Sequence, residues 1–207
     1  PADIWARTSG IWARQRRSRR APYPCERAQA HINSATIKKH DVANGVGVRV
    51  SLFVSGCTHR CEGCFNREAW DFSYGSPYTE QTQEEVLSAL APPYIAGLSL
   101  LGGEPFEPAN QRALLPLLEK FDALYPQKDC WCYTGYTLER DLFAGGRAHT
   151  EVTAALLSRI DVLVDGEFEL AKKELKLRFR GSSNQRIIDV KRTLREGRTI
   201  LWRDGKY

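Results

Sequence analysis

The feature that most constrains this chain is a loop with three cysteines within eight residues. It reads Gly56-Cys57-Thr58-His59-Arg60-Cys61-Glu62-Gly63-Cys64-Phe65-Asn66, and a run rich in β-branched residues, 48–54, leads into it. Thiolates are soft ligands that suit zinc or iron–sulfur clusters. Clustered cysteines of an intracellular protein more often bind metal than form disulfides. The cysteine loop therefore predicts a metal centre.

Three kinds of site could use three cysteines. A structural zinc site normally has four protein ligands, and the candidates for the fourth are His59, Cys130 and Cys132. A [4Fe-4S] cluster can instead be held at three corners, which leaves its fourth iron open to a substrate. The third possibility is that the three cysteines are structural and bind no metal. Three thiols crowded in one glycine-flanked loop are poor core formers, so the spacing favours the cluster.

The length and charge of the chain limit its size class and the partners that it can have. A chain of 207 residues can bury one good core, and its content of 42% hydrophobic and 27% charged residues is ordinary for a globular protein. The net charge is +5, and the whole excess lies in residues 1–30, so residues 31–207 give no electrostatic reason to expect nucleic acid. The apolar runs are too short to cross a membrane, and no signal-peptide core is evident. We expect a cytoplasmic protein without a membrane partner.

Residues 1–30 differ in character from the rest of the chain. Ile4-Trp5-Ala6-Arg7 recurs as Ile11-Trp12-Ala13-Arg14, and an arginine-rich run and two prolines follow. An arginine-rich arm for nucleic acid or a transit peptide would fit this composition. The chain has no methionine, and this segment uses Arg without any Lys. These features favour a disordered or non-native extension, in which Cys25 is a free thiol.

The remaining residues alternate between predicted strands and predicted helices. Strands are predicted at 48–54, 97–101, 129–134 and 160–164, and a strand–loop–strand unit at 175–179 and 187–190. Helices are predicted from a cap at Thr82 to about residue 90, at 110–124 with an interruption or late start at Pro116, and at 150–159. A short helical turn is expected within 66–72. This order predicts a parallel sheet covered by helices.

A second motif, Gly102-Gly103-Glu104-Pro105, ends the predicted strand 97–101. Alone it would be an ordinary turn. Ligands of such α/β folds bind at the carboxyl ends of the strands, so this stretch, the cysteine loop and Asp165-Gly166 are expected at one edge of the sheet. Glycine lets the backbone approach a ligand closely, and a carboxylate suits an ammonium group.

Together the two motifs resemble the radical S-adenosylmethionine (SAM) enzymes. The cysteine spacing, followed by Phe65-Asn66, is the strong part of this likeness. Further stretches, from about residue 31 to the end, resemble the activating proteins of anaerobic ribonucleoside-triphosphate reductase. These stretches are Asn44-Gly45, Arg49, 52–57, Trp70, Trp131 with Thr134-Gly135-Tyr136, 162–166 with Phe168, and Arg180-Gly181-Ser182-Ser183-Asn184-Gln185. Leu101, where many relatives have Ser or Thr, is a mild departure.

The resemblance implies two cofactors and their contacts. One [4Fe-4S] cluster per chain would be bound by three ligands, Cys57, Cys61 and Cys64, and SAM would chelate the fourth iron. SAM itself would lie beside Gly63, Cys64 and Phe65, and its methionyl end would be held by Gly102, Gly103 and Glu104. No general acid or base is implied, so no catalytic residue is assigned beyond the cluster and SAM. Cys130 and Cys132 lie outside the motif and are expected to be structural.

The resemblance also implies an activity. Reductive cleavage of SAM would give methionine and a 5′-deoxyadenosyl radical. That radical would take a hydrogen atom from the α-carbon of one glycine in the large subunit of anaerobic ribonucleoside-triphosphate reductase. A one-electron donor such as a flavodoxin would supply the electron. Such an activity needs a docking surface for the partner's glycine loop. Residues 181–186 and Asp165-Gly166-Glu167 are the candidates for it, with ordinary surface loops as the alternative.

The implied fold is α/β, a partial (incomplete) TIM-like barrel of parallel strands with outer helices. Residues 31–207 would form one radical SAM activase domain, and residues 1–30 would lie outside it. Only four or five strands are evident in the sequence, so the barrel would be open at one side.

Three other assignments remain open at this point. The chain could activate another glycyl-radical enzyme of the pyruvate formate-lyase type, although those activases are usually longer and lack the Gly-Ser-Ser-Asn-Gln-Arg ending. It could be a small-molecule radical SAM enzyme such as a deazaguanine synthase. It could also be a non-catalytic zinc or iron–sulfur binding module, which would not cleave SAM.

Overall fold

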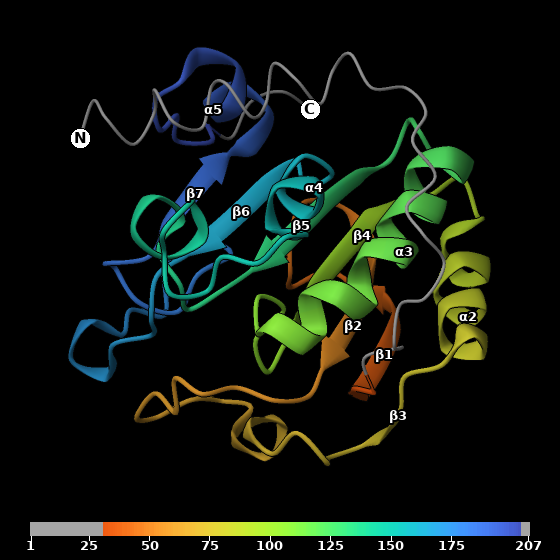
Figure 1. The fold of residues 1–207 in the computed structure, drawn as a ribbon, viewed down its shortest axis with the longest axis horizontal. Coiled ribbons are helices and arrows are strands. Elements are labelled where there is room, and N and C mark those ends of the chain that lie inside the picture. Colours follow the sequence, from red (N-terminus) through yellow and green to blue (C-terminus); the bar gives the residue numbers. More distant parts are fainter. Residues whose placement is uncertain (1–30, 204–207) are drawn as a thin grey trace.

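The computed structural model describes residues 31–203, which form a mixed α/β fold around one sheet (Figure 1). In this part of the chain seven strands follow the order β3-β1-β2-β4-β5-β6-β7. Their bounds are β1 Asn33–Asp41, β2 Val48–Val54, β3 Ser76–Pro77, β4 Ile95–Gly102, β5 Asp129–Tyr133, β6 Val162–Asp165 and β7 Arg186–Asp189. The predictions for residues 1–30, Cys25 included, lie outside the described residues.

The centre of the sheet is parallel and its edges are antiparallel. β2, β4, β5 and β6 are parallel neighbours, whereas β1 pairs antiparallel with β2 and β3, and β7 pairs antiparallel with β6. The six residues of β2 after Val48 are all buried, as expected of a central parallel strand covered on both faces. The predicted parallel sheet is confirmed for this centre, and the antiparallel strands β1 and β3 were not predicted.

Four regular helices occur within residues 31–203. They are α2 Glu80–Leu90, α3 Pro108–Leu124, α4 Thr153–Leu157 and α5 Val190–Glu196. α3 and α4 lie over one face of the sheet, with α2 beside α3 (Figure 1). Their apolar side chains pack with Leu52, Leu98 and Leu163 in the main core, and a smaller cluster around Trp131 uses the other face. None of the helices in the described chain is long and apolar enough to cross a membrane.

Thr79, and not Thr82, caps helix α2. The hydroxyl group of Thr79 accepts a hydrogen bond from the Thr82 N–H over 3.4 Å, and the hydroxyl group of Thr82 accepts one from the Thr79 N–H over 3.1 Å. This reciprocal pair is a capping box, in which Thr82 is the third helical residue. The predicted cap was therefore wrong by three residues, because Thr82 is the other half of the motif.

Helix α3 runs without a break from Pro108 to Leu124, so the predicted interruption or late start at Pro116 is wrong. A proline inside a helix costs about 3 kcal/mol. The leucines on either side of it, Leu115 and Leu117, are buried against the core. Full burial of one such side chain contributes about 1.5–3 kcal/mol, so packing outweighs the proline penalty.

The C-terminal part differs most from its prediction. The stretch 175–179 is loop and not strand, and Leu175 is 91% exposed. No strand of the described chain pairs with this stretch, so its backbone joins no ladder. The second predicted strand exists as β7, and the predicted helix 150–159 has only the regular turn α4.

The expected helical turn after the cysteine loop is confirmed as η1, Arg67–Trp70.

Candidate functional site

The cysteine loop, residues 56–66, leaves the end of β2 and returns to the sheet edge at η1. Two backbone hydrogen bonds close its base. The Gly56 N–H donates to the Ala69 carbonyl over 2.8 Å, and the Cys57 N–H donates to the Trp70 carbonyl over 3.2 Å. The loop thus lies at the carboxyl end of a parallel strand, where ligands bind in folds of this class.

The three cysteines of the loop differ in burial but affect one another electrostatically. Cys57 is buried, whereas Cys61 and Cys64 are half-buried. Burial and the charge of Glu104 raise the pKa of Cys57 to about 12. Burial and the charges of Glu167 and Cys64 also raise the pKa of Cys61. A hydrogen bond from the backbone of Phe168 lowers this pKa but does not cancel the rise. Thiolates in such a place need a compensating cation, which a metal centre supplies.

The donors of the described residues do not converge on one point, as the ligands of a single zinc ion would. Within residues 31–203 no group of three or more His, Cys, Asp or Glu side chains is placed to hold one metal ion. A zinc site needs such convergence because all of its ligands bind one atom. The ligands of a [4Fe-4S] cluster are spread over different irons. Cys130 and Cys132 do not complete a zinc site, because both lie fully buried in β5, where burial raises their pKa values.

The Gly-Gly-Glu stretch lies directly against the cysteine loop. The Gly103 N–H donates to the Val54 carbonyl over 2.7 Å, and the Glu104 N–H donates to the Gly56 carbonyl over 2.8 Å. A Cβ on Gly102 would lie 2.5 Å from the Val54 oxygen, and one on Gly103 would lie 2.4 Å from the Gly56 oxygen. Only glycine permits an approach this close. The predicted meeting of the two motifs at one edge of the sheet is confirmed.

Glu104 connects the ends of two parallel strands. Its carboxylate is buried, and Oε1 accepts hydrogen bonds from the Thr134 hydroxyl group and the Phe106 N–H, both over 2.8 Å. Oε2 accepts a hydrogen bond from the Gly135 N–H over 2.7 Å. The sequence suggested that this carboxylate would suit a ligand's ammonium group, but protein donors occupy both of its oxygens. Gly102 and Gly103 are half-buried, so their backbone is the part of the stretch nearer to solvent.

His59 lies inside the cysteine loop between two carboxylates. Its Nδ1 is 2.6 Å from Oε1 of Glu167, its Nε2 is 3.2 Å from Oε2 of Glu104, and its side chain is 3% exposed. The ring contacts Tyr136 edge-on, and a Cβ on Gly135 would lie 2.7 Å from it. Burial opposes a charge on the ring, but the hydrogen bonds and charges of the two glutamates outweigh burial. The pKa of His59 therefore lies above its ordinary value.

Glu107 is a site residue that the sequence reasoning missed. One of its carboxylate oxygens accepts hydrogen bonds from the Thr58 N–H over 2.8 Å and from the Thr58 hydroxyl group over 2.6 Å. It is buried and directly precedes α3, so it ties the cysteine loop to the start of that helix. Its place three residues after Glu104 was the only signal available in the sequence.

The outer end of the cysteine loop presents an aromatic side chain to solvent. Phe65 is 84% exposed, and the sulfur atom next to it, on Cys64, accepts a hydrogen bond from the Asn66 N–H over 3.4 Å. Aromatic side chains bury a large apolar area when they pack. A ring left exposed beside this loop is therefore free to contact a ligand or a partner.

The stretch 181–186 packs on the loop that follows β6. Oε1 of Gln185 accepts hydrogen bonds from the N–H groups of Gly181 and Ser182, over 2.8 and 3.1 Å. Nε2 of the same side chain donates to the Gly166 carbonyl over 3.0 Å. These two stretches, which lie apart in the sequence, therefore form one surface next to the cysteine loop.

Comparison with known proteins agrees with this geometry. A family model described as a 4Fe-4S single cluster domain matches residues 43–188. A relative from Pasteurella multocida, named anaerobic ribonucleoside-triphosphate reductase-activating protein, is 44% identical over 149 residues, which cover 71% of this chain and 90% of the relative. A relative of the same name from Enterobacteria phage T4 is 41% identical over 156 residues, which cover 75% of this chain and 93% of the relative. The chain belongs to this family.

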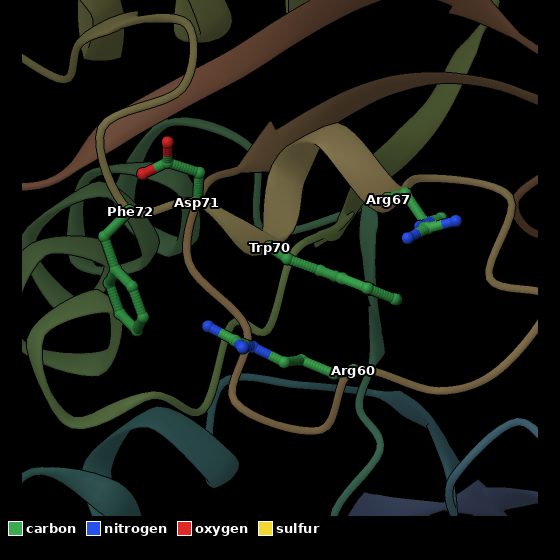
Figure 2. A pocket seen from close by; sticks show the side chains of 5 residues that line it. All are labelled: Arg60, Arg67, Trp70, Asp71 and Phe72. Carbon is green, nitrogen blue, oxygen red and sulfur yellow. The ribbon is translucent and has the colours of Figure 1, made fainter.

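As a member of the activating-protein family, the chain carries a 4Fe-4S cluster domain, and the matched span includes the whole cysteine loop. A pocket of about 420 Å³ borders the outer side of that loop (Figure 2). It is lined by Arg60, Arg67, Trp70, Asp71 and Phe72. The guanidinium group of Arg67 lies 5.1 Å from the centroid of the Trp70 ring. The resemblance had singled out Trp70, but it gave no hint of the two arginines.

Proposed function

We propose that this protein activates anaerobic ribonucleoside-triphosphate reductase by generating a glycyl radical on its large subunit. The observation that carries the proposal is the contact between the cysteine loop and the Gly-Gly-Glu stretch, because it brings the three cysteines next to the glycine backbone to which we assign SAM. The names of the relatives support the choice of target. The protein is thus a radical SAM oxidoreductase.

In this proposal the cluster is held by three thiolates, those of Cys57, Cys61 and Cys64. SAM lies against the outer end of the loop, at Gly63, Cys64 and Phe65. Its methionyl end lies against Gly102, Gly103 and Glu104. The exposed ring of Phe65 gives the adenine an apolar face. The carboxylate of Glu104 is engaged by Thr134 and Gly135, so we assign to this side chain the positioning of the Gly-Gly backbone.

When bound, the reduced cluster and SAM supply a 5′-deoxyadenosyl radical, which takes a hydrogen atom from the partner's glycine. The residues of this chain bind, orient and shield these groups. Glu107 fixes Thr58 and Glu104 fixes the strand ends, so the cysteine loop is held from two sides. No side chain is required as a general acid or base.

We further propose that the sheet is the wall of an incomplete TIM-like barrel, with residues 31–207 as one activase domain and residues 1–30 outside it. The parallel order of β2, β4, β5 and β6, with helices on one face, supports this reading. A barrel that is open at one side admits a protein substrate. The surface formed by residues 181–186 and Asp165-Gly166-Glu167 is the candidate dock for the partner's glycine loop.

The electron comes, in this proposal, from a one-electron donor such as a flavodoxin. The pocket between Arg60 and Arg67 borders the cysteine loop and offers a donor a short path to it. We place the protein in the cytoplasm, where thiols remain reduced and available for a cluster.

The decisive experiment mixes the reconstituted, reduced protein with SAM and the large subunit of the reductase without oxygen. We expect a glycyl-radical doublet by EPR, together with methionine and 5′-deoxyadenosine. A doublet with a pyruvate formate-lyase type enzyme, but none with the reductase, would reassign the target. A colourless protein that holds one zinc ion and cleaves no SAM would contradict the proposal.

A further inference from the structure

The residues that follow β6, 166–172, lie across the cysteine loop, and we call them the cover segment. Glu167 of this segment reaches His59, which is 108 residues away in the chain, with 2.6 Å between Oε1 and Nδ1. The imidazole is 3% exposed, whereas the Glu167 side chain is 48% exposed. The buried ring is the fixed partner of this pair, so His59 is the anchor that holds the Glu167 side chain.

Two more contacts fasten the cover segment to the cysteine loop. The backbone N–H of Phe168 forms a hydrogen bond to the sulfur atom of Cys61. Leu170 packs over Gly63, because a Cβ on that glycine would lie 2.9 Å from Cδ1 of the leucine. The segment therefore lies along the part of the loop that carries the second and third cysteines.

The other side of the cover segment is bonded to the stretch 181–186. Nδ2 of Asn184 donates to the Glu167 carbonyl over 2.8 Å, and the Glu169 N–H donates to the Ser182 hydroxyl group over 3.2 Å. The segment thus connects the cysteine loop with the surface that we assigned to the partner's glycine. A shift of the segment would change the distance between these two parts of the site.

We propose that His59 and Glu167 are positioning residues that lock the cover segment onto the cysteine loop and thereby couple SAM cleavage to hydrogen abstraction from the partner. This inference rests on the proposed function. In coupled turnover the 5′-deoxyadenosyl radical takes its hydrogen atom from the glycine α-carbon, so one 5′-deoxyadenosine forms per glycyl radical. With the lock broken, the 5′-deoxyadenosyl radical would take its hydrogen atom from dithiothreitol, the thiol reductant of the assay. A thiyl radical would then remain on dithiothreitol, and no glycyl radical would form.

The test uses Glu167→Gln, which keeps the size of the side chain and removes its charge. Glu169→Gln is the matched control, because Glu169 lies in the same segment at similar exposure and pairs with Lys172. Hydrogen exchange of the metal-free protein is the first measurement. We expect peptides from residues 57–64 and 166–172 to exchange about fivefold faster or more in Glu167→Gln, and as in the wild type in Glu169→Gln.

The second measurement is the ratio of 5′-deoxyadenosine to glycyl radical in the reconstituted enzyme with its partner. We expect a severalfold higher ratio for Glu167→Gln at unchanged iron content. His59→Gln should raise the ratio as well, and the double variant should be no worse than His59→Gln, because the two residues act as one unit. Equal ratios for Glu167→Gln and Glu169→Gln would overturn the coupling role.

The two measurements separate this inference from the proposed function. If the wild type forms no glycyl radical on any partner, the proposed function fails, and so does the coupling. Hydrogen exchange still decides whether the lock exists in the protein alone. Unchanged exchange in Glu167→Gln would overturn the lock even for an active enzyme.

Discussion

The hydroxyl group of Thr134 donates a hydrogen bond to the buried carboxylate of Glu104 over 2.8 Å. Glu104 ends the Gly-Gly-Glu stretch after β4, and Thr134 directly follows β5, so this bond joins two neighbouring strand ends. The same carboxylate contacts His59 of the cysteine loop. One buried acidic group therefore holds together the three segments that build the proposed cofactor site.

Removing either partner of this bond should lower the free energy of unfolding by different amounts. Thr134→Val keeps the shape of the side chain but removes the donor to Glu104 and the acceptor for the Tyr136 N–H, which should cost about 1–2 kcal/mol. Glu104→Gln places an amide group against the N–H donors of Phe106 and Gly135, which should cost about 2–3 kcal/mol. Urea unfolding of the metal-free proteins measures both changes. An equal or smaller loss for Glu104→Gln would contradict this role of the carboxylate.

Gly103→Ala should displace the cysteine loop. The new Cβ would lie 2.4 Å from the Gly56 carbonyl oxygen and 2.7 Å from that of Ala69, and neither backbone atom can yield without moving the loop. We expect a loss of about 1–3 kcal/mol in stability and a clear fall in iron bound after reconstitution.

Gly145→Ala is the matched control for this substitution. Gly145 has φ 89° and no atom within 4 Å of an added Cβ, so its replacement costs about 1–3 kcal/mol through backbone strain alone. This variant should bind iron as the wild type does. Normal iron binding by Gly103→Ala would show that the close approach of the two motifs is not required.

The parts that could be predicted from sequence are those fixed by local patterns. β2 was predicted to the residue, because its run of β-branched and apolar residues is bounded by Gly47 before it and by Ser55-Gly56 after it. The interruption at Pro116 was wrong because packing against the sheet outweighs a local backbone penalty. The contact of His59 with Glu167 could not be foreseen, since it joins residues 108 positions apart through the strand order of the sheet.

Serine substitution of any one loop cysteine should abolish cluster binding. Cys57→Ser, Cys61→Ser and Cys64→Ser each remove a soft thiolate ligand, so iron and sulfide content should fall to trace levels. Cys132→Ala is the control, because this residue is fully buried in β5 and faces the main core. It should lose about 1 kcal/mol of stability through lost packing but keep the cluster. A cluster retained by Cys57→Ser, or lost by Cys132→Ala, would refute the ligand assignment.

Asp141 should make the stability of the fold depend on pH. Its carboxylate is buried and accepts hydrogen bonds from the Thr137 N–H over 2.7 Å and from Arg140 and Arg147, both over 2.9 Å. Burial alone would raise the pKa of Asp141, but these hydrogen bonds and arginine charges outweigh it and hold the pKa below its ordinary value of 3.8.

A carboxyl group with a lowered folded-state pKa stabilises the protein above its ordinary pKa, and this contribution is lost as the pH falls through the folded-state value. Asp141→Asn should therefore cost about 1–3 kcal/mol at neutral pH. The difference in unfolding free energy between wild type and variant should narrow as the pH falls below about 4. There the Asp141 carboxyl group begins to be protonated in the unfolded state, and at lower pH it is protonated in the folded state too. Urea unfolding at a series of pH values measures this difference, and a difference that stays constant down to acid pH would contradict the assignment.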